Sequence, residues 1–174
     1  FGQAVSSNTD DFERATDGAR KYIEALDDLE DRISNYAVAS AKANLKISEA
    51  EFNAADRRFS IQERRKFLEE AIALSSKEVA EQRKFAEERF VLEAEKLASL
   101  TGLTAEEIAL YVEMTEEQKK NASEAVKTAR NKYEEEFKAL NEFGAKVFEE
   151  QEKFFTENKK NNAKTVYFMK IIEI

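Results

Sequence analysis

Acidic side chains stand next to one another at several places in this chain, and carboxylates can act as general acids or bases or hold a metal ion. The runs are Glu87-Glu88, Glu134-Glu135-Glu136 and Glu149-Glu150. Two-metal sites in helical bundles combine such glutamates with a Glu-x-x-His pattern. The chain contains no histidine, so that site cannot be built in its usual form. We interpret these carboxylates as solvated side chains and expect no metal.

The residues needed for nucleophilic catalysis and for phosphate binding are also missing. Without cysteine or histidine, neither a Cys-His pair nor a Ser-His-Asp triad is possible. No GxxxxGK or GxGxxG sequence is present to hold phosphates. Ser75-Ser76-Lys77 is best read as a polar helix face. We therefore expect no enzyme activity, no catalytic residue and no cofactor.

The composition predicts an all-α protein with long helices. Proline is absent, only four glycines occur and 37% of the residues are charged, which is typical of long helices and coiled coils. The 13 Phe and 5 Tyr residues argue against disorder. A net charge of −8 disfavours binding to nucleic acid or anionic membranes. No apolar run reaches the ~18 residues of a membrane span, so we expect none.

Heptad spacing dominates the first third of the chain. From Phe12 to Ala54, small or apolar residues recur at alternating intervals of three and four, a coiled-coil pattern with one polar exception. We expect five residues of this seam to contact a partner helix: Tyr22, Leu26, Leu29, Ile33 and Tyr36. A second stripe runs beside the first: Val38, Ala41, Leu45, Ser48, Phe52, Ala55 and Phe59. The two stripes together predict a helix with two neighbours.

The later helices carry looser stripes. In the second long helix the apolar stripe is interrupted by Ser75, Gln82 and Glu93. In the last long helix the interaction residues that we expect are Phe137, Leu140, Val147 and Phe154. Their helical spacing favours a packed core or a seam between chains, and the alternative is an exposed groove for a partner helix.

The sequence LTGLTAEEI, near the middle of the chain, predicts a turn. Gly102 can take the left-handed conformation that closes a helix. Thr104 is placed as an N-cap with Glu107 three residues later, the spacing of a capping box. We therefore predict that the second long helix ends here and that the chain changes direction.

Caps and stripes together divide the chain into a frayed lead-in, a helical domain and an apolar tail. The lead-in is 1–8, the domain is 9–164 with helices at about 10–57, 61–100, 105–113 and 116–158, and the tail is 165–174. A break near 56–60 is favoured, although a continuous helix through this region remains an alternative. The predicted fold has three long helices and one short connecting helix in an antiparallel bundle or coiled coil. The tail is open to interpretation as a strand, a docking segment or the start of another element.

Taken in order, these features resemble a known kind of protein. A helix bearing Asn and Ala leads to a polar interruption and then to a helix that begins S-x-x-E-R. The matching residues are Ser60, Glu63, Arg64, Leu68 and Ala71, then Thr101-Gly102, followed by the pairs Thr104 and Glu107, and Thr115 and Gln118. Residues from about 20 to 155 are thus similar to the helical middle of tail tape-measure proteins from phages and prophages of Bacteroidetes-type bacteria.

The resemblance implies a structural role that depends on length. Tape-measure proteins occupy the lumen of the tail tube, and their helical extent sets tail length. It also implies a place in the virion tail after assembly in the bacterial cytoplasm. The implied partners are proteins, either further copies of the chain or tail-tube and chaperone proteins. This chain lacks the long apolar stretches and wall-degrading motifs of the full-length proteins, and it begins FGQAV without Met, so we expect a middle piece.

A second interpretation requires no such resemblance. Three long helices of similar length joined by short loops are also typical of a spectrin-like three-helix bundle or a coiled-coil adaptor. Such a module would bind a partner protein through one of its faces. The heptads rich in alanine serve either purpose, so the sequence leaves open whether the helices pair within one chain or between chains.

Overall fold

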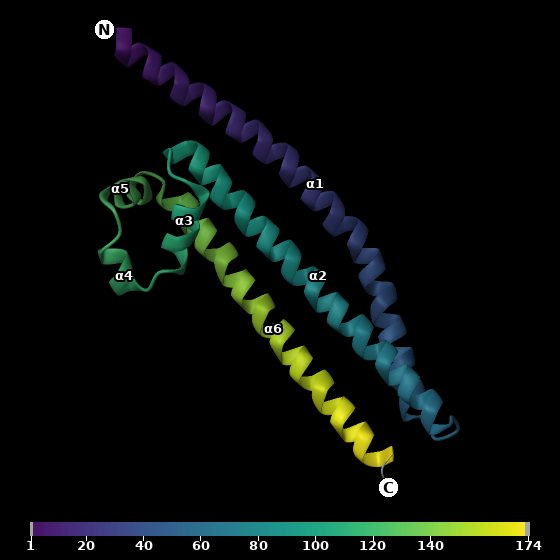
Figure 1. Cartoon of the computed structure of the whole chain (residues 1–174). Coiled ribbons are helices and arrows are strands. Elements are labelled where there is room, and N and C mark those ends of the chain that lie inside the picture. The colour runs from purple at the N-terminus through teal and green to yellow at the C-terminus, as the bar shows by residue number, and fades with distance from the viewer. Residues whose placement is uncertain (1, 173–174) are drawn as a thin grey trace. The chain divides into compact units, whose positions relative to one another are not determined.

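The computed structural model describes residues 2–172 of the chain, with side chains from residue 9 to residue 170. The described residues form six α-helices and no strand (Figure 1). The helices are α1 (Gly2–Ala55), α2 (Ile61–Thr101), α3 (Ala105–Glu113), α4 (Glu116–Lys120), α5 (Glu124–Lys132) and α6 (Glu134–Ile172). The prediction of an all-α fold is therefore confirmed, and the two long helices α1 and α2 pack against each other.

The helix expected over 116–158 is divided into α4, α5 and the beginning of α6. Thr115 is the N-cap of α4 and forms a capping box with Gln118. Ser123 then starts α5, because its side chain accepts a hydrogen bond from the backbone N–H of Val126. Tyr133 leaves the helical conformation at the end of α5, with φ −122° and ψ 48°. The stripe of apolar residues continues across these interruptions, which is why hydrophobic spacing alone suggested one helix.

The two ends of the chain also differ from the expected boundaries. The first helix starts at Gly2, so residues 2–8, which we expected to be frayed, are helical. The last helix continues beyond 158 to Ile172. It includes most of the apolar tail, whose final two residues lie outside the described part. The polar run near 160 contains neither Gly nor Pro, and polarity alone does not end a helix.

The chain leaves α1 in a short turn and enters α2 through a capping box. The Asp56 carboxylate accepts a hydrogen bond from the backbone N–H of Arg58 at 2.9 Å and also pairs with that arginine side chain. Ser60 and Glu63 then form the box, with the Ser60 N–H donating to Glu63 at 2.9 Å and the Glu63 N–H donating to Ser60 Oγ at 3.3 Å. Of the two alternatives for 56–60, the structure therefore has the break.

The turn around Gly102 contains all of the features that its sequence suggested. Gly102 has φ +73°, a conformation that L side chains rarely adopt. Thr104 is the N-cap of α3, and its N–H donates to Glu107 at 2.9 Å while the Glu107 N–H donates to Thr104 Oγ1 at 3.1 Å. Ile108, one turn into the helix, is fully buried. By fixing where α3 begins, the cap places the Ile108 side chain in the core.

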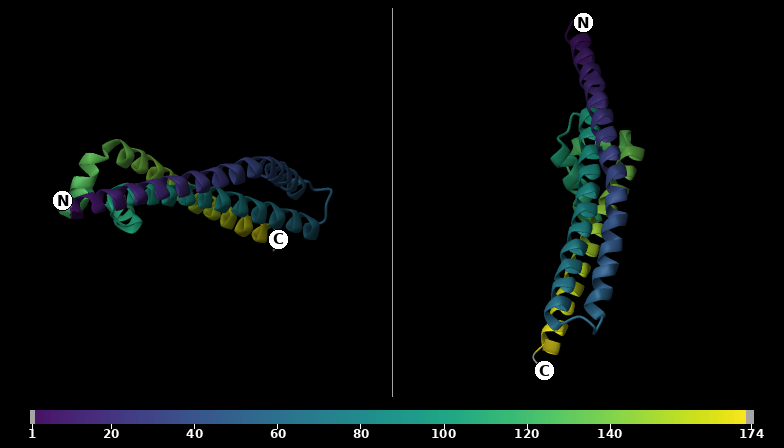
Figure 2. Two further views of the ribbon diagram at one scale, coloured as in Figure 1. Left: turned by 90° about the horizontal axis from the view of Figure 1, so that it is seen from above. Right: turned by 90° about the vertical axis from the view of Figure 1, so that its right-hand side faces the viewer.

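The packing divides the chain into two compact units, which are described separately. Unit 1 comprises residues 1–31 and 86–147, and unit 2 comprises residues 32–85 and 148–174. Helices α1, α2 and α6 each contribute to both units. Figure 2 shows unit 1 from two further sides, with the segment from α3 to α5 beside the C-terminal end of α2.

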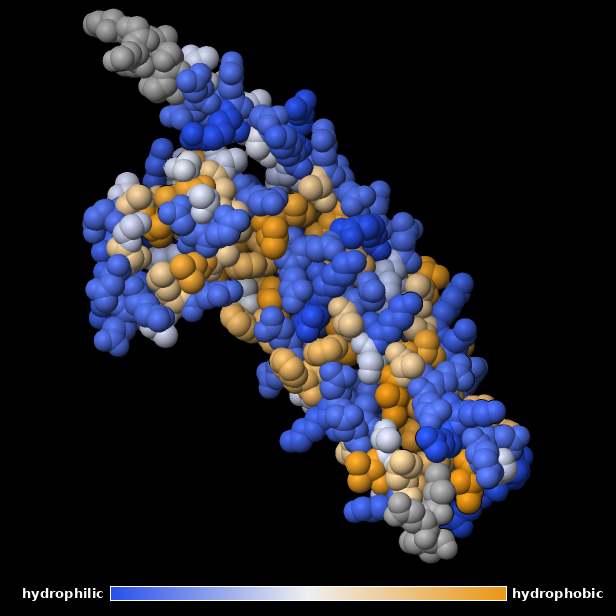
Figure 3. Space-filling view, in the orientation of Figure 1, coloured by the Kyte–Doolittle hydropathy of each residue, from blue (hydrophilic) through white to orange (hydrophobic). Residues whose placement is uncertain are grey.

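Unit 1 contains the larger apolar cluster of the described residues. Its buried members are Ala94, Leu97, Ile108, Ala129, Phe137 and Leu140. Figure 3 shows apolar side chains gathered where the segment from α3 to α5 meets α2 and α6, with charged side chains around them. Tyr111 meets Phe137 edge to face, with ring centroids 5.8 Å apart. The Tyr133 hydroxyl donates to the backbone carbonyl of Leu100 at 3.1 Å and so joins α5 to the end of α2.

Unit 2 has a thinner core that relies on alanines and on cations above aromatic rings. Its buried apolar residues are Ala50, Ala54, Ala71 and Phe168. Arg64 donates to the backbone carbonyl of Ala54 at 2.8 Å and lies over the Phe168 ring at 5.7 Å. Arg83 lies over the Phe154 ring at 4.6 Å. Small residues let the helix backbones approach closely, and the long cationic side chains cover the aromatic rings.

A close helix contact in unit 1 depends on a glycine that the sequence analysis did not single out. Gly18 lies in α1 against Ser99 in α2. A Cβ atom added at residue 18 would overlap Cβ and Oγ of Ser99. Because Cβ is fixed by the backbone, the overlap could be relieved only by moving the helices apart.

We therefore predict that Gly18→Ala destabilises the protein by roughly 1–3 kcal/mol, although alanine favours a helix over glycine by about 1 kcal/mol. The second substitution Ser99→Gly should recover much of the loss by making room for the new methyl group. Urea unfolding of the two single variants and the double variant measures this coupling. A Gly18→Ala protein more stable than the wild type would contradict the close contact.

Candidate helix-pairing surface

The expected seam residues of unit 1 lie between α1 and α2. Leu29 is fully buried, and Tyr22 and Leu26 are half-buried. The Tyr22 hydroxyl donates a hydrogen bond to the carboxylate of Glu93 on α2, with an O–O distance of 2.5 Å. This hydrogen bond joins residues far apart in the sequence and fixes where α1 lies along α2.

Glu93 is a nearly buried carboxylate, with 7% of the residue exposed. Besides Tyr22, it meets the guanidinium of Arg89 at 3.2 Å and the ammonium of Lys96 at 3.6 Å. Lys96 in turn lies 4.8 Å from the centroid of the Tyr22 ring. Two cations and a phenol therefore compensate for the removal of this carboxylate from water, as a buried charge requires.

A matching contact occurs in unit 2, two heptads further along α1. The Tyr36 hydroxyl donates to the carboxylate of Glu78 at 2.7 Å. Glu78, also 7% exposed, accepts further hydrogen bonds from Ser40 and, at 3.0 Å, from the side-chain amide of Gln82. Ser40 is the polar exception in the seam, and its hydroxyl is used here. Ile33, the remaining expected seam residue, is 41% exposed.

Both tyrosines are held in their protonated form. Burial, the hydrogen bond to Glu93 and the negative charge of that carboxylate together raise the pKa of Tyr22 to about 12. Burial, followed by the hydrogen bond to Glu78, likewise raises the pKa of Tyr36 above its ordinary value. A phenol with a raised pKa is a hydrogen-bond donor and a poor nucleophile. The chemistry of these clusters is therefore structural.

The residues expected from the last long helix are divided between the two units. Phe137 and Leu140 are buried in the core of unit 1, and Val147 is half-buried there. Phe154 belongs to unit 2, where it is half-buried and meets Phe155 edge to face at 5.9 Å. Phe155 itself is exposed. The first three residues therefore pack within unit 1, whereas Phe154 lies next to the exposed ring of Phe155.

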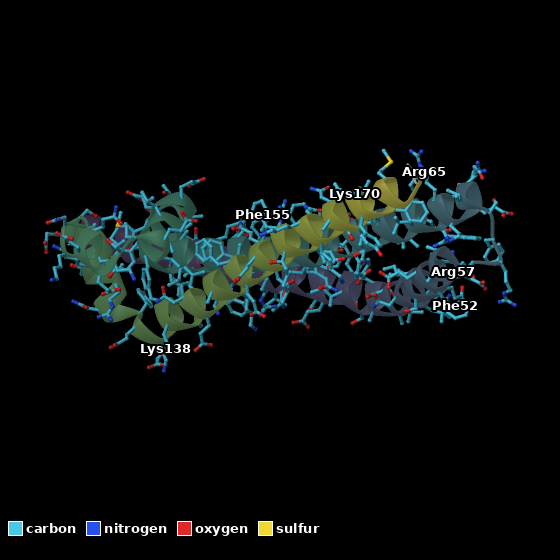
Figure 4. The ribbon with its side chains drawn as sticks, turned by 90° about the horizontal axis from the view of Figure 1, so that it is seen from below. Phe52, Arg57, Arg65, Lys138, Phe155 and Lys170 are labelled. Atoms are coloured by element: carbon cyan, nitrogen blue, oxygen red, sulfur yellow. The ribbon has the colours of Figure 1, made fainter. Side chains whose placement is uncertain are left out.

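The second stripe of α1 is on the solvent-facing side of the helix. We call its six helical members the outer stripe: Val38, Ala41, Leu45, Ser48, Phe52 and Ala55. All six are exposed, and the three large ones, Val38, Leu45 and Phe52, are 60%, 61% and 67% exposed. In Figure 4, Phe52 lies at the edge of α1 away from the ribbon of α6. The second neighbour expected for this face is not supplied by the described part of the chain.

Sequence reasoning identified the tyrosines of the seam but missed their acceptors. Glu93 and Gln82 were interpreted as interruptions of the stripe in the second helix, yet both belong to the polar contacts of the seam. Tyrosines that are buried in a seam need a partner for the hydroxyl group. Their presence at seam positions two heptads apart could therefore have indicated buried acceptors on the facing helix.

One open pocket in unit 2 has a basic lining. It is lined by Glu51, Ala54, Ala55, Arg57, Arg64, Leu68, Lys160, Lys164, Tyr167 and Phe168. Several of its charged groups already have partners in the chain. Arg64 binds the carbonyl of Ala54, and Lys164 pairs with Glu51. Within unit 2, these contacts join the C-terminal end of α1 to the beginning of α2 and to the end of α6.

Across residues 2–172, no group of three or more acidic side chains is arranged to hold a metal ion. None of the helices in this range has both the length and the apolar character that crossing a membrane requires. Comparisons with known protein families, curated proteins and solved structures gave no match, and so none identifies the chain as a tape-measure protein.

The first prediction from this surface concerns Tyr36. The variant Tyr36→Phe removes one of the donors to the nearly buried Glu78, so the free energy of unfolding should fall by about 1–2 kcal/mol. Tyr167→Phe is the matched control in the same unit, because Tyr167 is 69% exposed, and it should unfold like the wild type. Equal stability of the two variants in urea would show that the Glu78 contact contributes nothing.

The second prediction concerns alkaline pH. An unfolded tyrosine ionises near pH 10, whereas Tyr22 stays protonated in the folded chain up to about pH 12. The folded state therefore binds more protons in this range, so the stability that Tyr22 contributes should be fully present below pH 10 and should be lost between pH 10 and about 12. Urea unfolding at a series of pH values should show a smaller fall for Tyr22→Phe. A fall of equal size in both proteins would contradict the assignment.

Proposed function

We propose that this chain is a non-enzymatic structural protein, the helical segment of a phage tail tape-measure protein. The observation that carries the proposal is the uninterrupted 54-residue helix α1. A helix rises about 1.5 Å per residue, so uninterrupted helix converts residue number into distance. The resemblance of residues 20–155 to the helical middle of tape-measure proteins supports the same role.

The contacts between α1 and α2 support an antiparallel arrangement as part of this proposal. In unit 1, Tyr22 contacts Glu93 and Glu30 contacts Arg89. The residue number on α2 falls as the number on α1 rises, as expected for neighbouring helices that run in opposite directions. Under this arrangement the chain folds back on itself, and its contribution to length is smaller than that of one straight helix.

The tyrosine–carboxylate pairs are suited to a protein with a structural role. Sliding α1 along α2 by one turn would take Tyr22 and Tyr36 away from their acceptors and leave Glu93 and Glu78 short of donors. Because both carboxylates are nearly buried, such a shift is unfavourable. The helices are held in one register, and a gauge needs a fixed length. The partners that we propose are further copies of the chain and tail-tube or chaperone proteins, in the virion tail.

The outer stripe favours a second candidate function, a coiled-coil adaptor or spectrin-like module. Val38, Leu45 and Phe52 expose large apolar side chains on one helix face, and exposed apolar surface of this kind is typical of protein interaction sites. An adaptor would use this face for a partner protein and would need no fixed length.

Changing the number of residues tests the tape-measure proposal. In the phage or prophage that encodes the chain, an in-frame duplication of the 174-residue segment should lengthen the tail. The increase should be smaller than the roughly 260 Å that the same number of residues would add as one straight helix, because the segment folds back. Electron microscopy of negatively stained particles measures the change.

The control for this experiment keeps the residue number constant. Lys138→Gln changes an exposed side chain and should leave tail length at the wild-type value. Assembled tails of unchanged length in the duplicated strain would overturn the tape-measure proposal and favour the adaptor. Longer tails would count against the adaptor, because an interaction surface does not set a length.

A further inference from the structure

The outer stripe has a regular alternation of large and small side chains. Its large residues Val38, Leu45 and Phe52 follow one another at intervals of seven. Its small residues Ala41, Ser48 and Ala55 each lie three positions later and also repeat every seven residues. This is the spacing of the two core positions of a heptad, on a helix face that is exposed throughout. The stripe therefore has the pattern of a second coiled-coil seam.

We propose that the outer stripe pairs with the outer stripe of a second copy of this chain, in the antiparallel direction. In such a pair each large residue faces a small one across the interface, because the two core positions of a heptad alternate between antiparallel helices. Val38 faces Ala55 of the second copy, Leu45 faces its Ser48, and Phe52 faces its Ala41. Each contact then occurs twice, as a twofold axis requires.

The sizes of the side chains favour the antiparallel direction over the parallel one. A parallel pair would set Phe52 against Phe52 and Leu45 against Leu45, and the layers between them would contain only Ala41 or Ser48 from each chain. Two helices at a constant separation cannot fill both kinds of layer, and unfilled layers lose packing energy. The antiparallel pair gives every layer one large and one small side chain, so its layers are nearly uniform in width.

The charges beside the stripe favour the same direction. Lys42 and Glu49 are exposed and lie on the same flank of the stripe. In the antiparallel pair Lys42 of each copy comes next to Glu49 of the other, which gives two symmetric ion pairs. A parallel pair would instead bring Glu49 next to Asn44 and Lys42 next to Ala37, with no ion pair at these positions.

This inference concerns unit 2 alone and specifies one part of the proposed function, the association with further copies of the chain. It does not require the tape-measure role, since an adaptor could associate in the same way. It identifies the second neighbour that the width of the apolar face on α1 predicts. The stripe is short, at about two and a half heptads. We therefore expect a reversible dimer whose fraction depends on protein concentration.

The first experiment measures mass against concentration by analytical ultracentrifugation of the whole chain. The mass should rise from the monomer value of 20.0 kDa toward twice that value. Leu45→Glu places a charge at the centre of the stripe in both copies and should abolish the rise. The control Leu110→Glu changes an exposed leucine of α3 in unit 1 and should behave like the wild type. Circular dichroism verifies that both variants stay helical.

The second experiment determines direction and uses the absence of cysteine from the chain. Val38→Cys and Ala55→Cys are prepared separately and then mixed under mild oxidation. Only the mixture should form a disulfide-linked dimer, because residue 38 of one copy faces residue 55 of the other. Within each separate variant the two cysteines would be about 25 Å apart, too far for a disulfide.

A third experiment tests the ion pairs. Lys42→Glu should weaken the dimer about tenfold, because two attractions become repulsions. Adding Glu49→Lys exchanges the two charges and should restore association. A protein that is monomeric at all concentrations would overturn the proposal, as would disulfide-linked dimers of Val38→Cys alone, which indicate parallel pairing. Equal loss of association in Leu45→Glu and Leu110→Glu would place the interface elsewhere and overturn it as well.

Discussion

The constraint on which this structure depends is the burial of two carboxylates on α2. Glu78 and Glu93 are each only 7% exposed, and a carboxylate removed from water must be given hydrogen-bond donors or cations. Tyr36 and Tyr22 of α1 provide a donor to each. An apolar seam of alanines tolerates a shift along the helix axis, since one alanine resembles the next. The tyrosine–glutamate contacts have no such tolerance, and they select one alignment of α1 on α2.

Around these contacts the two units use different means of packing. Unit 1 has an apolar core in which Leu97, Ile108 and Leu140 are almost completely buried. The turn at Gly102 and the capping box of Thr104 set the start of α3, and this places Ile108 in the core. Unit 2 has fewer large buried apolar residues. Its small alanines leave the rings of Phe154 and Phe168 partly uncovered by apolar side chains, and arginine side chains lie over these rings instead. Unit 2 also contains the outer stripe, so the unit with the thinner core carries a row of exposed apolar residues at heptad spacing on α1.

The proposed functions agree with the chemistry of the two units. Polar groups in the seams are engaged in holding helices together, and the raised pKa values of Tyr22 and Tyr36 make them donors rather than reactive groups. A structural role as a tape-measure segment agrees with this chemistry, and so does an adaptor. The outer stripe adds a surface whose alternation of large and small residues suits a second copy in the antiparallel direction.

The sequence by itself determined the helical class, the corner at Gly102 and the caps at Ser60, Thr104 and Thr115, because these features depend on residues close together in the chain. It also located the tyrosines of the seam and the outer stripe, since a heptad needs only spacing. The tertiary structure alone decided that Glu78 and Glu93 are acceptors, that Gly18 makes room for Ser99, and that the outer stripe stays open. Spacing states which residues share a helix face, but burial and hydrogen bonding depend on what the rest of the chain places opposite that face.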